Sequence, residues 1–262
     1  MGIINLTPDS FFSESRYNGE AAILSRVESI LCEGGDMVDV GAYSTRPGAA
    51  LVTVEEELGR LMPALAVIRK AFPDVLVSVD TFRSEIARKA VLEGEADMIN
   101  DISGGEMDEA MYDTVATLNV PYILTHMQGT PQTMQEAPQY KDVVAEVSKW
   151  LAQRVDRLRD KGVNDIIIDP GFGFGKTLEH NFKLFNHLEE LALFQLPILV
   201  GISRKSMIYK VLESDADQAL NGTTVLNTLA LNKGANILRV HDVKEAAECV
   251  KLVEKLKEVD IV

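Results

Sequence analysis

The chain alternates short apolar runs with longer segments in which apolar residues recur every three or four positions. The short runs are typical of buried strands, and the longer segments are typical of amphipathic helices. The predicted strands occupy residues 3–6, 37–40, 75–79, 98–102, 121–125, 165–168, 197–200 and 237–240. The predicted helices occupy residues 20–32, 54–71, 84–93, 108–118, 142–161, 178–191, 205–232 and 244–258.

This alternation predicts eight strand–helix pairs. Strands that alternate with helices and are apolar on both faces indicate a parallel sheet covered by helices. Eight such pairs in 262 residues favour an α/β fold in which the sheet closes into a (β/α)8 TIM barrel. A doubly wound open sheet is the alternative. Since no linker or change of composition divides the chain, we expect a single domain over residues 1–262.

The chain carries a net charge of −14, from 26 Lys and Arg against 40 Asp and Glu. Such an acidic surface repels nucleic acid and anionic membranes, so neither is expected as a partner. An anionic substrate would therefore need a local cluster of cations.

Several features indicate the compartment. No apolar run approaches the length of a membrane span, and no basic region precedes a hydrophobic stretch at the N-terminus. Cys32 and Cys249 both fall in helical patterns and are interpreted as small core residues rather than a disulfide. We expect a cytoplasmic protein.

Polar residues follow almost every predicted strand. In a parallel barrel these positions lie on one rim, where barrel enzymes carry their active sites. They are Asn5, the turn 44–46, Asp80, Asn100 with Asp101, His126, Asp169, residues 203–205, and Arg239 with His241. A binding site explains the number of polar residues at the strand ends better than chance does.

The third, fourth and sixth strands supply acceptors at this rim, namely Asp80, Asn100 and Asp169. A carboxylate can accept two parallel hydrogen bonds from a guanidine-like edge. This group therefore favours a flat heterocycle with adjacent amino and ring N–H groups.

The seventh and eighth strands supply cations instead. Lys205, Arg239 and His241, with Arg46 from the second strand, form the expected cationic cluster, and barrels often bind phosphate near strands seven and eight. Asn5 could offer its oxygen to a Mg²⁺ ion that bridges phosphate oxygens. The rim thus predicts a guanidine-edged ring that carries a phosphate or diphosphate.

A glycine-rich run follows the sixth strand at residues 169–177. Its spacing matches neither a phosphate-binding loop, which needs Gly five positions before Gly175 where Pro170 stands, nor a dinucleotide fingerprint. We interpret it as a tight strand-to-helix connection at the candidate site.

Eight motifs together resemble the dihydropteroate synthase family. They are MGIINLTPDSF (1–11), DVGAYSTRPG (39–48), SVDT (78–81), INDISGG (99–105), THMQG (125–129), DPGFGFGKT (169–177), SRKS (203–206) and RVHD (239–242). The resemblance spans essentially the whole chain. It implies condensation of 6-hydroxymethyl-7,8-dihydropterin diphosphate with 4-aminobenzoate in folate biosynthesis, and a homodimer formed through the last helices, 225–231 and 246–256.

The resemblance also implies roles for individual positions. The pterin-binding positions are Asp80, Asn100, Asp169 and Lys205. The positions for diphosphate and Mg²⁺ are Arg239, His241 and Asn5. The positions of the 4-aminobenzoate site are Phe11, Thr45, Arg46, Phe174 and Ser206. The expected catalytic residues are Lys205, Arg239 and His241. The chain departs from the family's pattern at residues 12–18 and at Ala42 and Tyr43.

Other interpretations stay open. Asp80 could cap the helix that begins near Ser84, Asp169 could be a turn acid, and Arg204 with Lys205 could be a solvated pair. The chain could also be a pterin-using methyltransferase with a corrinoid partner, a noncatalytic pterin-binding or interaction protein, or, least favoured, a nucleotide hydrolase. A corrinoid-dependent enzyme has little need for the cations at 203–205 and 239–241.

Overall fold

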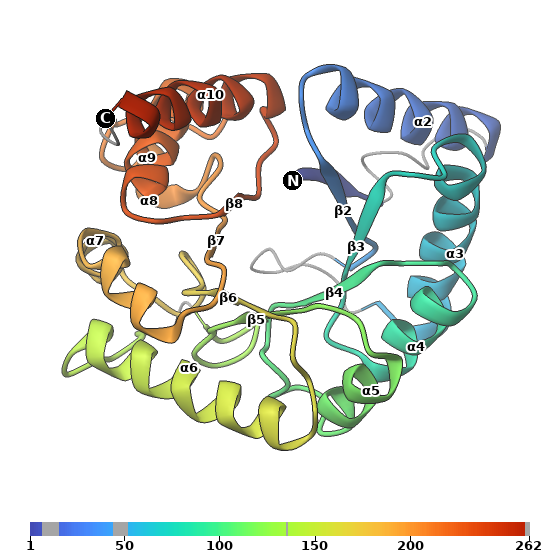
Figure 1. Ribbon diagram of the computed structural model, residues 1–262, viewed down its shortest axis with the longest axis horizontal. Coiled ribbons are helices and arrows are strands. Elements are labelled where there is room, and N and C mark those ends of the chain that lie inside the picture. The colour runs from blue at the N-terminus through green and yellow to red at the C-terminus, as the bar shows by residue number, and fades with distance from the viewer. Residues whose placement is uncertain (7–15, 44–51, 135, 260–262) are drawn as a thin grey trace.

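Parallel strands form the inner wall of the protein, and helices surround them (Figure 1). The structure is a computed structural model that describes residues 1–6, 16–43, 52–134 and 136–259. Within these residues the strands are β1 (Gly2–Asn5), β2 (Met37–Gly41), β3 (Leu76–Asp80), β4 (Met98–Asp101), β5 (Tyr122–Thr125), β6 (Ile166–Asp169), β7 (Leu199–Val200) and β8 (Ile237–Leu238).

The strands close into a barrel. Six of them pair in the order β1-β2-β3-β4-β5-β6, and β7 pairs with β8. Two single bridges join these sheets, between Ile168 and Ile198 and between Gly2 and Val240. The backbone N–H of Ile3 donates to the carbonyl of Val240 at 3.0 Å. The predicted barrel is confirmed, because an open sheet would leave β1 unpaired on this side.

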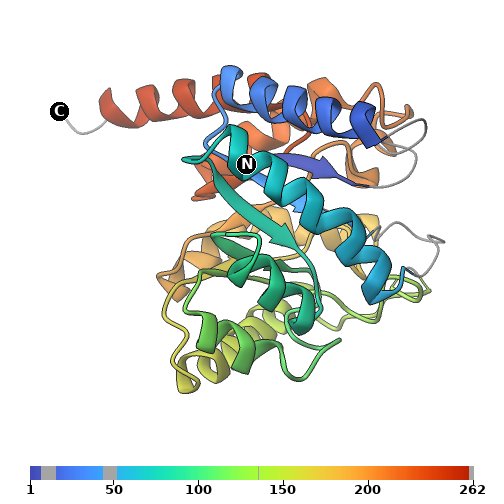
Figure 2. The same ribbon diagram turned by 90° about the vertical axis from the view of Figure 1, so that its right-hand side faces the viewer.

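The helices form the outer layer and follow the strands in turn. Figure 2 shows α2 and α3 lying along the outside of the strands. The helices are α2 (Arg16–Cys32), α3 (Val54–Ala71), α4 (Ser84–Leu92), α5 (Met111–Leu118), α6 (Val143–Asp160), α7 (Leu178–Asn186), α8 (Ser206–Tyr209), α9 (Leu220–Asn232) and α10 (Val243–Val259), with a 3₁₀ helix η1 (Leu188–Phe194) after α7. Within the described ranges, none of these helices has the length and hydropathy needed to cross a membrane.

Local capping explains where several helices begin. Thr53 accepts from the N–H of Glu56, and the Glu56 carboxylate accepts in return from the N–H of Thr53, which fixes the start of α3. Thr177 starts α7 in the same way, with His180 as its partner.

One predicted helix is wrong. Residues 205–232 do not form a continuous helix but divide into α8 and α9. The break follows from the local sequence, because the carboxylate of Asp215 accepts from the N–H groups of Asp217 and Gln218. Such Asx turns compete with helical backbone bonds.

The apolar core has two layers. The larger lies between the strands and the helices and includes Val38, Val79 and Leu124. The smaller fills the barrel interior below the strand ends and includes Met98, Ile123, Ile167 and Leu199, with Met1. Both faces of the strands are therefore apolar, as predicted.

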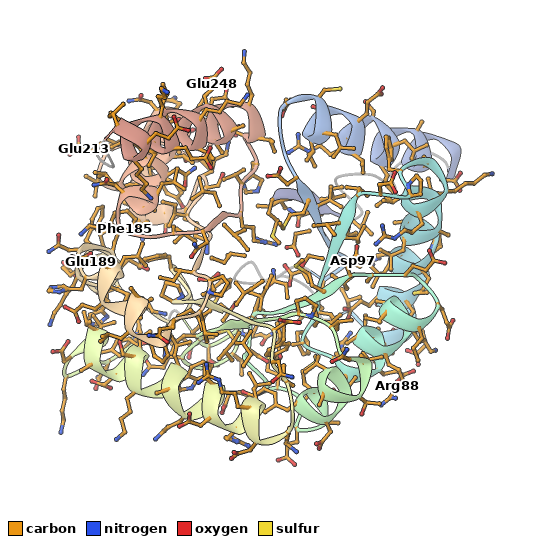
Figure 3. All side chains as sticks on the ribbon, viewed as in Figure 1. Arg88, Asp97, Phe185, Glu189, Glu213 and Glu248 are labelled. Carbon is orange, nitrogen blue, oxygen red and sulfur yellow. The ribbon has the colours of Figure 1, made fainter. Side chains whose placement is uncertain are left out.

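Charged side chains lie mainly on the outer face of the helices. Figure 3 shows Arg88, Glu189 and Glu248 on this face, and all three are exposed. The expectation for the cysteines is confirmed for Cys249, which is buried, and wrong for Cys32, which is exposed at the last residue of α2. The buried side chains of α2 include Ile23, Val27 and Ile30. Cys32 comes two residues after Ile30, which places it about 200° around the helix axis, on the opposite face.

Candidate active site

The strand register brings the predicted acceptors together at one end of the barrel. Asn5, Gly41, Asp80 and Asn100 are successive partners across β1, β2, β3 and β4. Asp169 ends β6 and is buried. The side chains from alternate positions of these strands point into the barrel, because successive strand residues face opposite sides. The predicted rim of polar residues is therefore present.

Arg239 forms hydrogen bonds with the acidic residues of the rim and is not separated from them. Its Nη2 donates to Oδ2 of Asp80 at 2.7 Å, and its Nε donates to Oδ2 of Asp39 at 2.6 Å. A second donor to the same Asp39 oxygen is Nδ2 of Asn100, at 3.1 Å. The expected separation of acceptors from cations is thus wrong for Arg239. Barrel closure places the segment after β8 beside β1, and from there the Arg239 side chain reaches Asp39 on β2 and Asp80 on β3.

These contacts also settle the alternative interpretation of Asp80. The N-cap of α4 is Arg83, and the N–H of Ser84 donates to Asp108 rather than to Asp80. Asp80 is therefore not a helix cap, and its carboxylate faces the interior of the barrel.

Burial and neighbouring charges shift the protonation of this group. Burial raises the pKa of Asp80 to about 7, although Arg239 acts in the opposite direction. Burial disfavours the charge of Arg239, but Asp39 and Asp80 outweigh it and hold the pKa of the guanidinium above its usual value. Burial also raises the pKa of Asp169. Such perturbed groups in one cluster are typical of functional sites.

The glycine-rich loop after β6 lies beside Asp169. Oδ1 of Asp169 accepts from the N–H of Gly171 at 2.7 Å, so this acid does make the turn contact considered as an alternative. Gly171, Gly173 and Gly175 have φ values of 71°, 85° and 64°, a region that L-residues rarely adopt. The loop can therefore fold tightly around the carboxylate.

Lys205 closes the other side of this loop. Its Nζ donates to the carbonyl of Phe172 at 2.5 Å and lies 4.4 Å from the ring centroid of Phe174. Burial lowers the pKa of Lys205 to about 8. Because it is half-buried and held by the loop, Lys205 is not half of a solvated surface pair.

Asp169, Arg239 and Lys205 belong to one site. A Cβ atom placed on Gly201 would lie 3.9 Å from both Oδ2 of Asp169 and Cβ of Arg239. A Cβ atom on Gly173 would lie 3.3 Å from the side chain of Lys205. Glycine at both positions keeps the space between these groups open.

His241 lies beside Ser203, after β8. Its Nδ1 is 3.0 Å from Oγ of Ser203, and its carbonyl accepts from Arg26 at 2.6 Å. Burial, with the charge of Arg239, lowers the pKa of His241 to about 4, so the ring is neutral at pH 7. Arg204 does not face the same way as this group, since its guanidinium pairs with Asp242 at 2.8 Å.

The remaining predicted residues are only partly described. Asn5 and Ser206 are half-buried, at the end of β1 and the start of α8 respectively. Phe11, Thr45 and Arg46 lie outside the described residues, as do most of residues 12–18. Their predicted roles stay predictions.

Sequence reasoning missed two buried charged residues at this site, Asp39 and Lys176. Asp39 is fully buried within β2, and Lys176 is buried beneath the glycine-rich loop, where Nζ donates to the carbonyls of Gly171 and Phe174 at 2.8 and 3.0 Å. The signal was available for Asp39, because an acid inside an apolar strand requires a partner.

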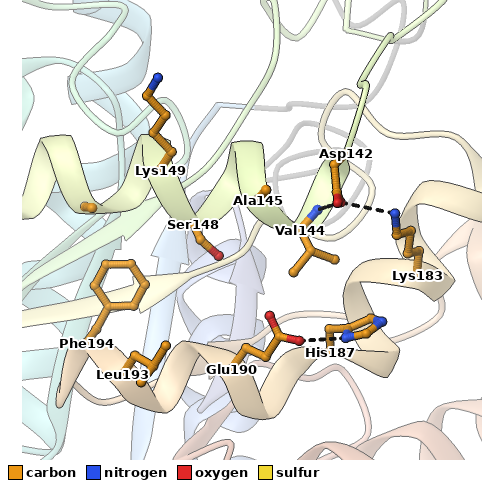
Figure 4. A pocket seen from close by; sticks show the side chains of 11 residues that line it. Asp142, Val144, Ala145, Ser148, Lys149, Lys183, His187, Glu190, Leu193 and Phe194 are labelled. Carbon is orange, nitrogen blue, oxygen red and sulfur yellow. Dashed lines mark hydrogen bonds and ion pairs between the residues drawn. The ribbon is translucent and has the colours of Figure 1, made fainter.

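A hollow of about 500 Å³ lies on the outer surface between α6, α7 and η1 (Figure 4). At its edge Asp142 forms an ion pair with Lys183 at 3.1 Å, and Nδ1 of His187 lies 2.7 Å from Oε1 of Glu190. It contains none of the predicted site residues. We therefore place the candidate active site at the strand ends.

Comparison with known proteins identifies the family of this protein. The sequence profile of the family described as pterin binding enzyme matches residues 1–241. The chain belongs to this family. The chain is a transferase with the fold of this family.

Individual relatives narrow the family further. The Escherichia coli (strain K12) dihydropteroate synthase is 43% identical over 256 residues, which cover 97% of this chain and 90% of the relative. The structure of Yersinia pestis dihydropteroate synthase in a sulfonamide drug complex matches with a TM-score of 0.91 and 38% identity, covering 99% of this chain and 93% of that one. The Xanthomonas albilineans dihydropteroate synthase structure with 4-aminobenzoic acid matches with a TM-score of 0.88 and 38% identity, covering 100% and 93%. Within the pterin-binding family, this chain falls with the dihydropteroate synthases of folate biosynthesis, as the motifs predicted.

Proposed function

We propose that this protein condenses 6-hydroxymethyl-7,8-dihydropterin diphosphate with 4-aminobenzoate, giving 7,8-dihydropteroate and diphosphate. The observation that carries the proposal is the cluster at the strand ends, where buried acceptors stand beside Arg239 and Lys205. The similar Xanthomonas albilineans structure holds 4-aminobenzoic acid, which supports the second substrate. A corrinoid-dependent methyltransferase would not require these cations.

Asp80, Asn100 and Asp169 bind the pterin ring in this proposal. Their carboxylate and amide oxygens accept from the amino and ring N–H groups. Lys205, held at 2.5 Å from the Phe172 carbonyl, donates to a ring acceptor from the other side.

Arg239 and His241 bind the diphosphate. The guanidinium offers a bidentate donor set to phosphate oxygens. His241 is neutral in the free protein, but a bound anion favours its protonated form, which adds a second positive charge.

Asn5 is proposed to hold Mg²⁺ together with phosphate oxygens. The described residues contain no group of three or more acids, His and Cys residues that could enclose a metal ion. This fits Mg²⁺, which usually keeps several waters and binds through one or two protein oxygens and the substrate phosphates. When bound, the ion supplies charge neutralisation to the departing diphosphate.

The amine site is proposed to consist of Phe11, Thr45, Arg46, Phe174 and Ser206. Phe174 lies against Lys205, so an arylamine stacked near this ring would lie beside the bound pterin. Ser206, the first residue of α8, would donate to the carboxylate.

The reaction then needs no protein nucleophile. The C–O bond to diphosphate breaks first, because Arg239 and His241 stabilise the leaving charge. The electron pair leaves with the diphosphate, and the methylene cation is stabilised by the pterin nitrogens and by Asp80 and Asp169. The neutral arylamine attacks this carbon and loses a proton. Positional isotope exchange in the labelled diphosphate, measured without amine, tests this order; no exchange would contradict it.

The function itself is tested with purified protein, the pterin diphosphate, Mg²⁺ and radiolabelled 4-aminobenzoate. We expect labelled pteroate. Well-folded protein that binds the pterin but forms no labelled product would instead support a binding protein. Lys205→Ala and Asp169→Ala should each abolish pterin binding, whereas Arg204→Ala, which removes a side chain paired with Asp242, should not.

We also propose a homodimer in the cytoplasm. The last helices expose apolar side chains, including Val225 and Leu229 on α9 and Leu252 and Leu256 on α10. Cys32 and Cys249 are free, in keeping with a reducing compartment.

A further inference from the structure

Asp39 occupies an unusual place for an acid. It lies in the middle of β2, with Ile3 and Ser78 as its partners on the neighbouring strands, and it is fully buried. Val38 and Val40 on either side of it belong to the outer apolar core, so Asp39 faces the inside of the barrel. It therefore lies one level below Asp80, beneath the mouth of the barrel.

One oxygen of Asp39 holds two residues of the site. Its Oδ2 accepts from Nε of Arg239 at 2.6 Å and from Nδ2 of Asn100 at 3.1 Å. The other end of the guanidinium reaches Asp80 through Nη2 at 2.7 Å. Arg239 is therefore fixed at its stem by Asp39 and at its tip by Asp80.

Stability alone does not account for this arrangement. Oδ1 of Asp39 is buried and has no hydrogen-bond partner among the described residues. A buried acceptor without a partner is unfavourable, and buried ion pairs often stabilise a fold less than apolar residues of similar size. A carboxylate that is costly at this position is better explained by what it orients.

The two contacts of Arg239 differ in their consequences for substrate. Asp80 is one of the acceptors assigned to the pterin ring, so the ring must take over the contact that Nη2 makes. Asp39 is deeper and keeps its contact with Nε while this exchange occurs. The guanidinium then retains a buried counter-ion, and its outer nitrogens can turn toward the diphosphate.

We propose that Asp39 is a positioning residue that anchors Arg239 and Asn100 from beneath, so that Asp80 is released to the pterin while Arg239 stays aimed at the diphosphate. The proposal rests on the proposed function for the identity of the ligand. It assigns to Asp39 a role through its neighbours, without direct contact to either substrate.

The first test compares Asp39→Asn with Glu57→Gln. Asn keeps a neutral acceptor but loses the charge, so Arg239 should pair more tightly with Asp80 and compete with the pterin. We expect the affinity for 6-hydroxymethyl-7,8-dihydropterin, measured by calorimetry, to fall about tenfold or more. We expect kcat to fall by a similar factor, while the KM for 4-aminobenzoate changes less than about threefold.

Glu57 is a matched control because it is also a buried acid paired with an arginine, Arg83, but on the helix layer. Glu57→Gln should lower the unfolding temperature and leave pterin affinity near wild type. Asp39→Asn with wild-type affinity and kcat would overturn the proposal. The affinity measurement does not require turnover. If the wild-type protein binds the pterin but makes no pteroate, the proposed function is refuted, and the role of Asp39 can still be tested by affinity.

A second measurement uses the unaltered protein, in case Asp39→Asn does not fold. The ¹⁵Nε–H signal of Arg239, assigned by its loss in Arg239→Lys, reports the contact with Asp39 by nuclear magnetic resonance. We expect this N–H to exchange slowly with solvent in the free protein and with the pterin diphosphate bound. Rapid exchange in the bound state would show that Asp39 does not hold Arg239 there, and would overturn the proposal.

Discussion

Nζ of Lys176 lies 2.9 Å from Nδ1 of His126, in the interior beneath the glycine-rich loop. The same Nζ donates to the carbonyls of Gly171 and Phe174. Burial and the neighbouring Lys176 lower the pKa of His126, so this ring is neutral and can accept at Nδ1. Burial lowers the pKa of Lys176 to about 7, but three acceptors match the three N–H groups of an ammonium. The loop beside Asp169 is therefore held from below by a buried cation.

Lys176→Met should destabilise the protein. The substitution leaves two carbonyls and His126 without their donor, and we expect a loss of roughly 2–4 kcal/mol in the free energy of unfolding. Lys183→Met is the matched control, because Lys183 is exposed and pairs with Asp142 at the surface; it should cost under about 1 kcal/mol. Urea unfolding measures both, and equal losses would show that the buried contacts contribute little.

Gly171→Ala should disrupt the same loop. Gly171 has a φ of 71°, and a Cβ atom there would lie 1.8 Å from the carbonyl oxygen of His126. We expect a loss of about 2 kcal/mol or more and weaker pterin binding, because Asp169 loses its backbone donor. Gly59→Ala is the control, because a Cβ atom at this position in α3 would meet nothing within 4 Å outside the helix's own backbone. This variant should be more stable by about 0.5–1 kcal/mol. If both variants unfold at the same urea concentration, the loop tolerates a side chain at residue 171.

The sequence predicted the barrel and the composition of its rim because both depend on local patterns. Asp80, Asn100 and Asp169 each end an apolar run, and a polar residue at that position is visible without coordinates. Closure places all such ends on one rim, so their proximity follows from the fold class.

The pairing within the rim was not predictable in the same way. Arg239 reaches Asp39 and Asp80 only because the segment after β8 returns to β1, which brings residues 239 and 39 together across 200 positions. The contact of Lys176 with His126 depends on how the glycine-rich loop folds, and the spacing of residues 169–177 carries no information about that fold. Periodicity shows which face a residue occupies, but not which neighbour it meets.

His241 should make stability depend on pH. Its pKa is about 4 in the folded protein, against roughly 6.5 in an unfolded chain. Between these values the unfolded chain binds a proton that the folded protein does not, so this contribution is lost as the pH falls from about 6.5 to about 4. His241→Asn removes it, and the variant should lose less stability than the wild type between pH 7 and pH 5. Urea unfolding at pH 7 and pH 5 measures the free energy of unfolding of both proteins. The prediction is contradicted if the difference in this free energy between wild type and variant is the same at both pH values.

The proposed dimer predicts a specific effect of charge on α10. Leu252 and Leu256 are 69% and 65% exposed, and an interface through the last helices would bury them. The wild type should sediment as a dimer. The double variant that carries both Leu252→Asp and Leu256→Asp should sediment as a monomer. Leu193→Asp is the control, since Leu193 is 88% exposed but lies on η1. A monomeric wild type in analytical ultracentrifugation would refute the interface.

The affinity for the pterin should fall at low pH because Asp80 must accept its N–H groups as a carboxylate. Burial raises the pKa of Asp80 to about 7, so the fraction of free protein with the ionised acceptor falls as the pH drops through this value. Binding favours the ionised form and releases up to one proton, and the affinity should decline by up to about tenfold per pH unit below pH 7. Asp80→Asn should bind more weakly and lose this dependence, since an amide does not titrate.

Calorimetry with 6-hydroxymethyl-7,8-dihydropterin between pH 6 and pH 8.5 measures both proteins. If Asp80→Asn keeps the wild-type pH profile, the proton belongs to another group, of which Asp169 is the first candidate because burial raises its pKa too.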